Sequence, residues 1–135
     1  MALPGGRRDA TDIDLVQTAI REVLEEVGLR LERDQLAGRL GDVIPRTPVL
    51  PPVAVRPFVF LLQTTPQLRL NPEVSAARWI PVDHLLRRET YRPVELEIRG
   101  ETREFPAYHL EDAFVWGMTE RILSDLLEEF RRTES

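Results

Sequence analysis

The chain has 135 residues, of which 42% are hydrophobic and 30% are charged, and its formal net charge is −5. This length suits one domain with its own core, and the composition is ordinary for a globular protein. The negative charge and the lack of a Lys/Arg block argue against bulk attraction to nucleic acid or anionic lipid, and no apolar run approaches a membrane span. Because the sequence contains no cysteine, disulfides, thiolate nucleophiles and cysteine zinc sites are excluded.

The N-terminal stretch carries a glycine pair followed by a helix-forming segment. Residues 1–3 are expected to end a strand that runs into Gly5-Gly6, and a helix is expected from about residue 12 to residue 27. Asp12 or Thr11 can cap its first turn, and Gly28 supplies the left-handed residue at its end. Helical spacing predicts one apolar stripe that faces a core, formed by Val16, Ile20, Val23 and Val27.

The opposite face of this helix, which also includes Thr18, is rich in carboxylates. Glu22, Glu25 and Glu26 share one patch in the C-terminal turn, where repulsion between neighbours and the helix dipole both disfavour anions. Arg21 can pair with Glu25 one turn later, and a hard divalent cation would compensate more, because magnesium prefers carboxylate oxygens. A solvated acidic face is the alternative interpretation of these residues taken alone.

The rest of the chain is predicted to alternate strands and loops before a final helix. Four prolines within residues 45–52 predict a stiff surface loop. Gly100-Glu101 predicts a two-residue hairpin turn, residues 81–86 a short helix, and residues 111–131 an amphipathic helix with Trp116 on its core side. The expected strands cover residues 36–44, 53–62, 75–80, 94–98 and 102–108.

The N-terminal residues resemble the Nudix box. Gly6, five residues, Asp12, eight residues and then the run from Arg21 to Leu29 follow the order of that motif, and the second half matches at every fixed position. Asp12 stands where glutamate is usual, and the gap after it is one residue longer. Both departures resemble the coenzyme A pyrophosphatase branch of the family, as do Pro4-Gly5-Gly6 and Trp116-Gly117-Met118-Thr119.

The resemblance implies an α+β fold, an α/β/α sandwich with a mixed sheet between the box helix and a C-terminal helix, as a single domain over residues 1–135. It implies an Mg²⁺- or Mn²⁺-dependent hydrolase that cleaves a pyrophosphate bond in a nucleoside diphosphate linked to another moiety, with coenzyme A or its derivatives as the leading substrate. ADP-ribose, dinucleotides and nucleoside triphosphates are alternative substrates, and an inactive Nudix-fold binding or regulatory module is the alternative of another class. We expect a cytoplasmic protein with no nucleic-acid or membrane partner, and a homodimer is left open.

The same resemblance assigns roles to individual residues. Glu22, Glu26 and the Gly5 carbonyl are implied metal ligands, and Glu25 is either a further ligand or the general base. Arg21 is expected to orient a glutamate through a charge-assisted hydrogen bond, and the structural role of capping is favoured for Asp12. A further carboxylate ligand is left open among Glu101, Glu104, Glu111 and Asp112.

The family places at least one strand before its glycine loop. The coenzyme A branch also carries an Arg- and Gly-rich signature there, ending in Phe-Pro-Gly-Gly, of which only Leu3-Pro4-Gly5-Gly6 is present here. We therefore expect Met1 to be an internal methionine of a longer protein, so that the fold is N-terminally incomplete. An in-frame stop just upstream of the Met1 codon, with no Arg/Gly-rich reading frame before it, would contradict this expectation.

Overall fold

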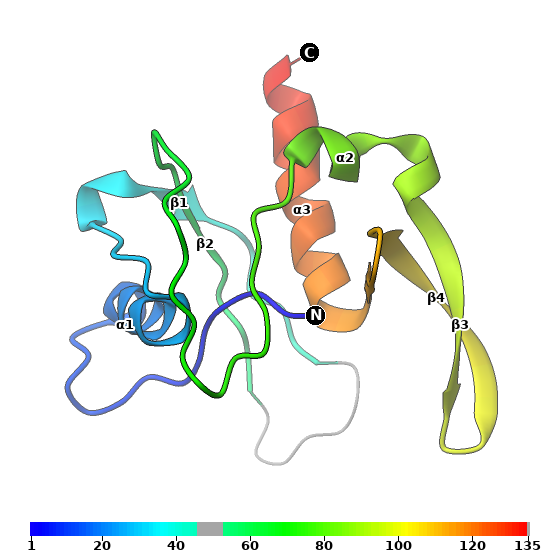
Figure 1. The fold of residues 1–135 in the computed structure, drawn as a ribbon, viewed down its shortest axis with the longest axis horizontal. Helices are drawn as coiled ribbons and strands as arrows, with labels where there is room; N and C mark the ends of the chain where they lie inside the picture. The colour runs from blue at the N-terminus through cyan, green and yellow to red at the C-terminus, as the bar shows by residue number, and fades with distance from the viewer. Residues whose placement is uncertain (46–52, 135) are drawn as a thin grey trace. The chain divides into compact units, whose positions relative to one another are not determined.

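The computed structural model describes residues 1–45 and 53–134 (Figure 1). Most of the loop predicted at residues 45–52 therefore lies outside the described residues. Helices combined with antiparallel sheets confirm the predicted α+β class. The helices are α1 (Leu15–Val27), α2 (Val82–Leu86) and α3 (Gly117–Glu134), and the strands are β1 (Leu36–Arg39), β2 (Phe58–Phe60), β3 (Tyr91–Ile98), β4 (Glu101–His109) and β5 (Phe114–Val115).

The chain divides into two compact units. The α1 unit comprises Leu3–Gly41 and Arg56–Trp79, and the α3 unit comprises the described residues of Met1–Ala2, Asp42–Val55 and Ile80–Ser135. The α1 unit holds the two-stranded sheet β1-β2, and the α3 unit holds the three-stranded sheet β3-β4-β5. The described strand pairs are antiparallel in both sheets, whereas the sequence predicted one mixed sheet. The single domain expected over residues 1–135 stays a prediction.

Helix α1 begins later than expected because a different aspartate caps it. The Asp14 carboxylate accepts a hydrogen bond from the Gln17 N–H at 2.9 Å, so the cap is neither Asp12 nor Thr11. Gly28 ends the helix with φ 69°, as predicted. The apolar stripe faces a small core formed by Val23, Val27 and Leu31, against which Ile20, Leu29, Phe60, Leu62 and Leu68 pack.

The strands of the α1 unit are shorter than their apolar runs suggested. Pro57 interrupts the run at residues 53–62 because it has no N–H to donate, and its carbonyl accepts from the Leu40 N–H at 3.0 Å. The strand pairing of this unit therefore covers residues 36–39 and 58–60, with an irregularity beside Gly38. In the α3 unit, an isolated antiparallel bridge joins Val43 to Val55. Residues 1–3 and 75–80, both expected to be extended strands, form no strand.

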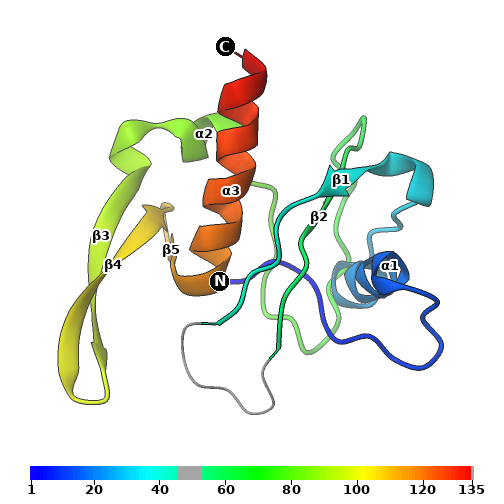
Figure 2. The ribbon, with the colours of Figure 1, turned by 180° about the vertical axis from the view of Figure 1, so that it is seen from behind.

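The α3 unit is built on the β3-β4 hairpin, whose turn lies one residue earlier than predicted. Ile98 pairs directly with Glu101, so the two turn residues are Arg99 and Gly100. Both have positive φ, at 54° and 79°, which is the conformation that the right-handed twist of a hairpin favours. Both strands are longer than the predicted ranges, and β5 adds to the end of β4 (Figure 2).

Helix α3 begins at Gly117, because the residues just before it form β5 instead of a helical turn. Trp116 therefore precedes the helix, is 38% exposed and packs against Phe105 with ring centroids 5.2 Å apart. The core position predicted for Trp116 is wrong. The buried core of this unit consists of Leu85, Tyr108, Val115, Leu123 and Leu127.

One buried carboxylate of the α3 unit is surrounded by hydroxyl groups. Glu120 accepts hydrogen bonds from the Tyr91 hydroxyl at 3.0 Å and from the Ser124 hydroxyl at 2.7 Å, and the Tyr108 and Ser124 hydroxyls lie 2.7 Å apart. Glu120 is 6% exposed. The network joins α3 to the hairpin through neutral partners.

Among the described residues, the structure contains no helix whose length and apolar character would allow it to cross a membrane.

Candidate active site

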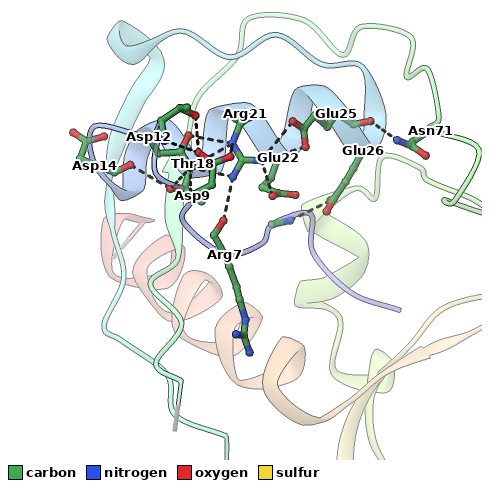
Figure 3. Close-up of polar contacts among 12 residues, drawn as sticks. Arg7, Asp9, Asp12, Asp14, Thr18, Arg21, Glu22, Glu25, Glu26 and Asn71 are labelled. Carbon is green, nitrogen blue, oxygen red and sulfur yellow. Dashed lines mark hydrogen bonds and ion pairs between the residues drawn. The ribbon is translucent and has the colours of Figure 1, made fainter. Parts of the chain in front are cut away.

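The loop before α1 lies against the carboxylates of that helix (Figure 3). The Gly5 N–H donates to the Oε2 atom of Glu26 at 3.2 Å. A β-carbon at Gly6 would lie 2.5 Å from the carboxyl carbon of Glu22, so a larger residue there would have to displace that carboxylate. The missing β-carbon of Gly6 therefore lets the backbone approach Glu22, whereas a β-carbon at Gly5 would meet no atom within 4 Å. The expected Gly5 carbonyl ligand stays a prediction.

Arg21 connects the acidic residues to one another and to the loop (Figure 3). Its Nε and Nη2 atoms donate to the two oxygens of Asp12, each at 3.0 Å. Its Nη1 atom donates to Glu22 Oε1 at 2.9 Å and to Glu25 Oε2 at 3.2 Å, and Nη2 also reaches the Arg7 carbonyl at 3.1 Å. One guanidinium thus holds two carboxylates of the helix side by side, and the predicted pairing of Arg21 with Glu25 is present.

Asp12 is the buried partner that fixes this guanidinium. Its side chain is 2% exposed, and it also accepts hydrogen bonds from the Thr18 hydroxyl and the Asp9 N–H, both at 3.0 Å. The hydrogen bonds from Arg21 hold the pKa of the Asp12 carboxyl well below its usual range. Asp12 therefore anchors Arg21 and does not cap the helix.

Sequence reasoning missed Thr18, which it placed on the exposed polar face. The side chain is 3% exposed, and its hydroxyl bonds the Asp12 carboxylate. Its position three residues before Arg21 puts the two side chains on one helix face. That spacing could have predicted that Thr18 lies beside Arg21. It could not predict that the Thr18 hydroxyl has a buried partner in Asp12.

Glu26 carries an electrostatic cost that a cation would remove. Burial raises the pKa of the Glu26 carboxyl, and the negative charges of Glu22 and Glu25 raise it further, against the opposing hydrogen bond from the Gly5 N–H. A divalent cation would favour the ionised carboxylate and reverse this shift.

The donor set of the α1 unit fits a hard, partly hydrated cation. Within residues 1–45 and 53–134, no three acidic, histidine or cysteine side chains already form a metal cage. Mg²⁺ does not need such a cage, because it usually keeps several waters and takes only one or two carboxylates from the protein. Glu22 and Glu26, with the backbone of the glycine loop beside both, would supply that kind of site.

The four late carboxylates considered as further ligands all belong to the α3 unit. All four residues are exposed, and Glu101 forms an ion pair with Arg103 at 3.1 Å. The acidic residues that the structure gathers around the glycine loop come from α1 and from the segment just before it. A ligand from Glu101, Glu104, Glu111 or Asp112 stays an open prediction.

A glycine loop lies against helical carboxylates, and one arginine bridges them; this donor set would suit a hard cation and phosphate chemistry. The family model described as the NUDIX domain matches residues 1–99. The chain therefore belongs to the Nudix family.

Relatives of this chain come from a fungus and from bacteria. It is 40% identical over 114 residues to "Uncharacterized protein C14C4.10c" of Schizosaccharomyces pombe, a match that covers 80% of this chain and 35% of that protein. It is 33% identical over 137 residues to "Uncharacterized Nudix hydrolase NudL" of an Enterobacter species, and 33% identical over 133 residues to the protein of that name in Salmonella paratyphi B. Each bacterial match covers 93% of this chain and 64% of the relative. The chain thus spans less than two thirds of the length of these curated relatives.

Proposed function

We propose that this chain hydrolyses, with Mg²⁺ or Mn²⁺, a pyrophosphate bond in a nucleoside diphosphate linked to another moiety. The observation that carries the proposal is the meeting of the Gly5-Gly6 backbone with the carboxylates of Glu26 and Glu22 on one face of α1. Membership of the Nudix family supports it. A small nucleotide is the proposed partner, and the cytoplasmic location and the homodimer stay predictions.

The three glutamates differ in exposure, which supports a division of roles. Glu22 and Glu26 are partly buried beside the glycine loop and would hold the cation, whereas Glu25 is exposed to water. As the general base, Glu25 would take a proton from a water whose oxygen bonds to phosphorus while the bridging P–O bond breaks. A bound cation supplies Lewis-acid stabilisation of the phosphate oxygens. Arg21 keeps Glu22 and Glu25 at fixed positions through Nη1.

Coenzyme A or a derivative is the substrate that we propose first, with 3′,5′-ADP and 4′-phosphopantetheine as products. The support is the extra residue between Asp12 and Arg21, together with the Pro4-Gly5-Gly6 and Trp116-Gly117-Met118-Thr119 segments. Turnover of coenzyme A and of ADP-ribose, each with Mg²⁺, separates this substrate from the main alternative. Faster turnover of ADP-ribose would contradict the choice of coenzyme A and leave the reaction class intact.

Glu26→Gln tests the reaction class. The change removes the ionised oxygen that would bind the cation, so kcat/KM should fall by about 100-fold or more while the far-UV circular dichroism is unchanged. Asp34→Asn is the matched control, because it neutralises an exposed carboxylate in the same unit away from the glycine loop. Turnover of Glu26→Gln at the wild-type rate would contradict the metal-site assignment.

The same assay addresses the longer start predicted from the sequence. Magnesium-dependent turnover by residues 1–135 is compared with turnover by an N-terminally extended chain translated from the upstream reading frame. Equal activity would show that the extension is dispensable for the reaction. Cation binding by both chains without turnover of any nucleotide tested would favour the inactive binding module.

A further inference from the structure

We propose that Asn71 is a positioning residue for the metal-binding carboxylates, because it holds the C-terminal turn of α1 from which they project. The inference rests on the proposed function, in which Glu26 binds the cation. Asn71 lies outside the box motif and is the only asparagine of the chain. It is 46 residues away from Glu25, whose carbonyl oxygen it contacts.

The last turn of α1 is completed by hydrogen bonds from a distant segment. The final carbonyl groups of a helix have no partner within the helix, and here each of the last four accepts an N–H. The Leu24 carbonyl accepts from Gly28 at 3.0 Å, and the other three accept from the segment at residues 69–71: Glu25 from Asn71 Nδ2 at 3.3 Å, Glu26 from Asn71 N–H at 3.0 Å and Val27 from Arg69 N–H at 2.7 Å.

The close approach of this segment depends on Gly28. A β-carbon at Gly28 would lie 2.7 Å from the Arg69 β-carbon and 2.9 Å from the Arg69 carbonyl oxygen. The glycine that ends the helix therefore also makes room for the segment that caps it. Because the contact runs through backbone on both sides, it fixes the position of the turn.

The Asn71 carboxamide is used at both ends, which fixes its orientation. Its side-chain Oδ1 atom accepts a hydrogen bond from the Glu73 N–H at 2.9 Å. The backbone carbonyl of Asn71 accepts another from the Val74 N–H at 2.8 Å. The oxygen thus stabilises a local turn, while Nδ2 is directed at the Glu25 carbonyl (Figure 3). A serine can keep the first role but is too short to keep the second.

The electrostatic setting explains why this donor matters to the site. The C-terminal end of a helix carries partial negative charge, and Glu25 and Glu26 add two carboxylates there. An amide donor directed at the Glu25 carbonyl opposes that accumulation. Without it, the Glu25 carbonyl loses its partner while the backbone bonds to Glu26 and Val27 remain, and we expect the Glu26 side chain to shift relative to the Gly5 N–H that it contacts at 3.2 Å.

The experiment measures Mn²⁺ affinity by electron paramagnetic resonance titration of the full chain, which reports on the site without any substrate. Asn71→Ser should weaken Mn²⁺ binding by about 2- to 10-fold, the range that corresponds to the net loss of one hydrogen bond. Gln67→Ser is the matched control, because Gln67 is exposed in the same connection and should leave the affinity unchanged. Asn71→Ala, which also loses the turn, should bind at least as weakly as Asn71→Ser.

One result would contradict the inference, one would support it, and one would contradict only the proposed function. Wild-type affinity in Asn71→Ser, with weak binding only in Asn71→Ala, would assign Asn71 to the turn alone and overturn the positioning role. In a turnover assay, the positioning role predicts a higher Mg²⁺ requirement with kcat largely restored at saturating Mg²⁺. Weakened Mn²⁺ binding in Asn71→Ser, in a chain that turns over no nucleotide, would support the positioning role and contradict the proposed hydrolysis.

Discussion

The two units of the chain stabilise their buried polar groups in different ways. In the α1 unit, buried Asp12 is paired with Arg21, whose guanidinium also binds two carboxylates of the helix. In the α3 unit, buried Glu120 has hydroxyl partners from Ser124 and Tyr91. The α1 unit therefore relies on pairs of opposite charge. The α3 unit relies on hydrogen bonds from uncharged hydroxyl groups, beside a larger apolar core.

The difference is consistent with the role proposed for the α1 unit, which is to bind a cation. A charged network holds several carboxylates at fixed positions, where a cation can join them, at the cost of mutual repulsion. Hydroxyl groups around a single carboxylate fix the packing of a helix on a hairpin without bringing several charged groups together. Removing the apolar core should therefore damage the α3 unit most, whereas changes to charge or helix ends should damage the α1 unit most.

The largest expected effect is on the apolar core of the α3 unit. Leu127 is 0% exposed, so Leu127→Ala removes buried methyl groups and leaves a cavity. We expect the free energy of unfolding, measured in urea, to fall by about 3 to 5 kcal/mol. Leu24→Ala on α1 is the matched control, because that leucine is 39% exposed and its loss should cost less than about 1 kcal/mol. Equal losses would contradict the placement of the main core.

The next effect compares two glycines with positive φ, one in each unit. Gly28→Ala would place a β-carbon in a left-handed conformation and against Arg69. It should lower the free energy of unfolding by about 2 to 4 kcal/mol. Gly100→Ala has similar strain but open space around its β-carbon, and should cost about 1 kcal/mol. Thermal denaturation of the two variants measures the difference. If both cost the same, the close approach of residue 69 to the helix end is contradicted.

A smaller effect is expected at Thr18. Thr18→Val keeps the shape of the side chain but removes the hydroxyl that bonds the Asp12 carboxylate at 3.0 Å, and should cost about 1 kcal/mol. Thr18→Ser retains the hydroxyl and should recover most of that loss. A Thr18→Val chain as stable as Thr18→Ser in urea denaturation would remove Thr18 from the charged network.

The finest test of the comparison is the response to pH. The pKa of Asp12 is lowered by Arg21, so the unfolded chain binds more protons, and the α1 unit should lose stability as pH falls below about 4. Burial raises the pKa of the Tyr108 phenol, with Glu120 adding to the shift, so the α3 unit should lose stability as pH rises above about 10. Amide hydrogen exchange in α1 and α3, corrected for intrinsic rates, measures each response.

Two variants isolate the titrating groups. Asp12→Asn should be less stable than wild type at neutral pH, and the difference should shrink in acid, where the wild-type carboxylate is protonated. Tyr108→Phe should flatten the alkaline loss of protection in α3. If lowering the pH increased amide exchange in α3 before it did so in α1, the assignment of the charged network to the α1 unit would be contradicted.

The sequence predicted the acidic site better than the elements around it. The spacing of Glu22, Glu25 and Glu26 places them on one helix face wherever that helix begins, so their proximity followed directly from the motif. The first residue of the helix could not be predicted in the same way, because three aspartates precede it. Only the tertiary contact with Arg21 occupies Asp12, so that Asp14 caps the helix.

The other differences also arose from contacts or competition that local patterns do not record. The apolar run at residues 53–62 predicted one long strand, but Pro57 has no N–H to continue the pairing. The hairpin turn shifted by one residue because Arg99 adopts positive φ beside Gly100. The contact between Asn71 and α1 joins residues far apart in the sequence, and no short-range pattern indicates it.

The hydrogen bonds from residues 69–71 have a consequence for the order of events during synthesis. The whole box motif is translated before these residues, yet the carbonyls at the end of α1 acquire three of their four partners only afterwards. An isolated helix of 13 residues is marginal in water. A nascent chain that ends before residue 69 therefore contains the full motif by which the family is recognised, but lacks the support that keeps its acidic turn in place.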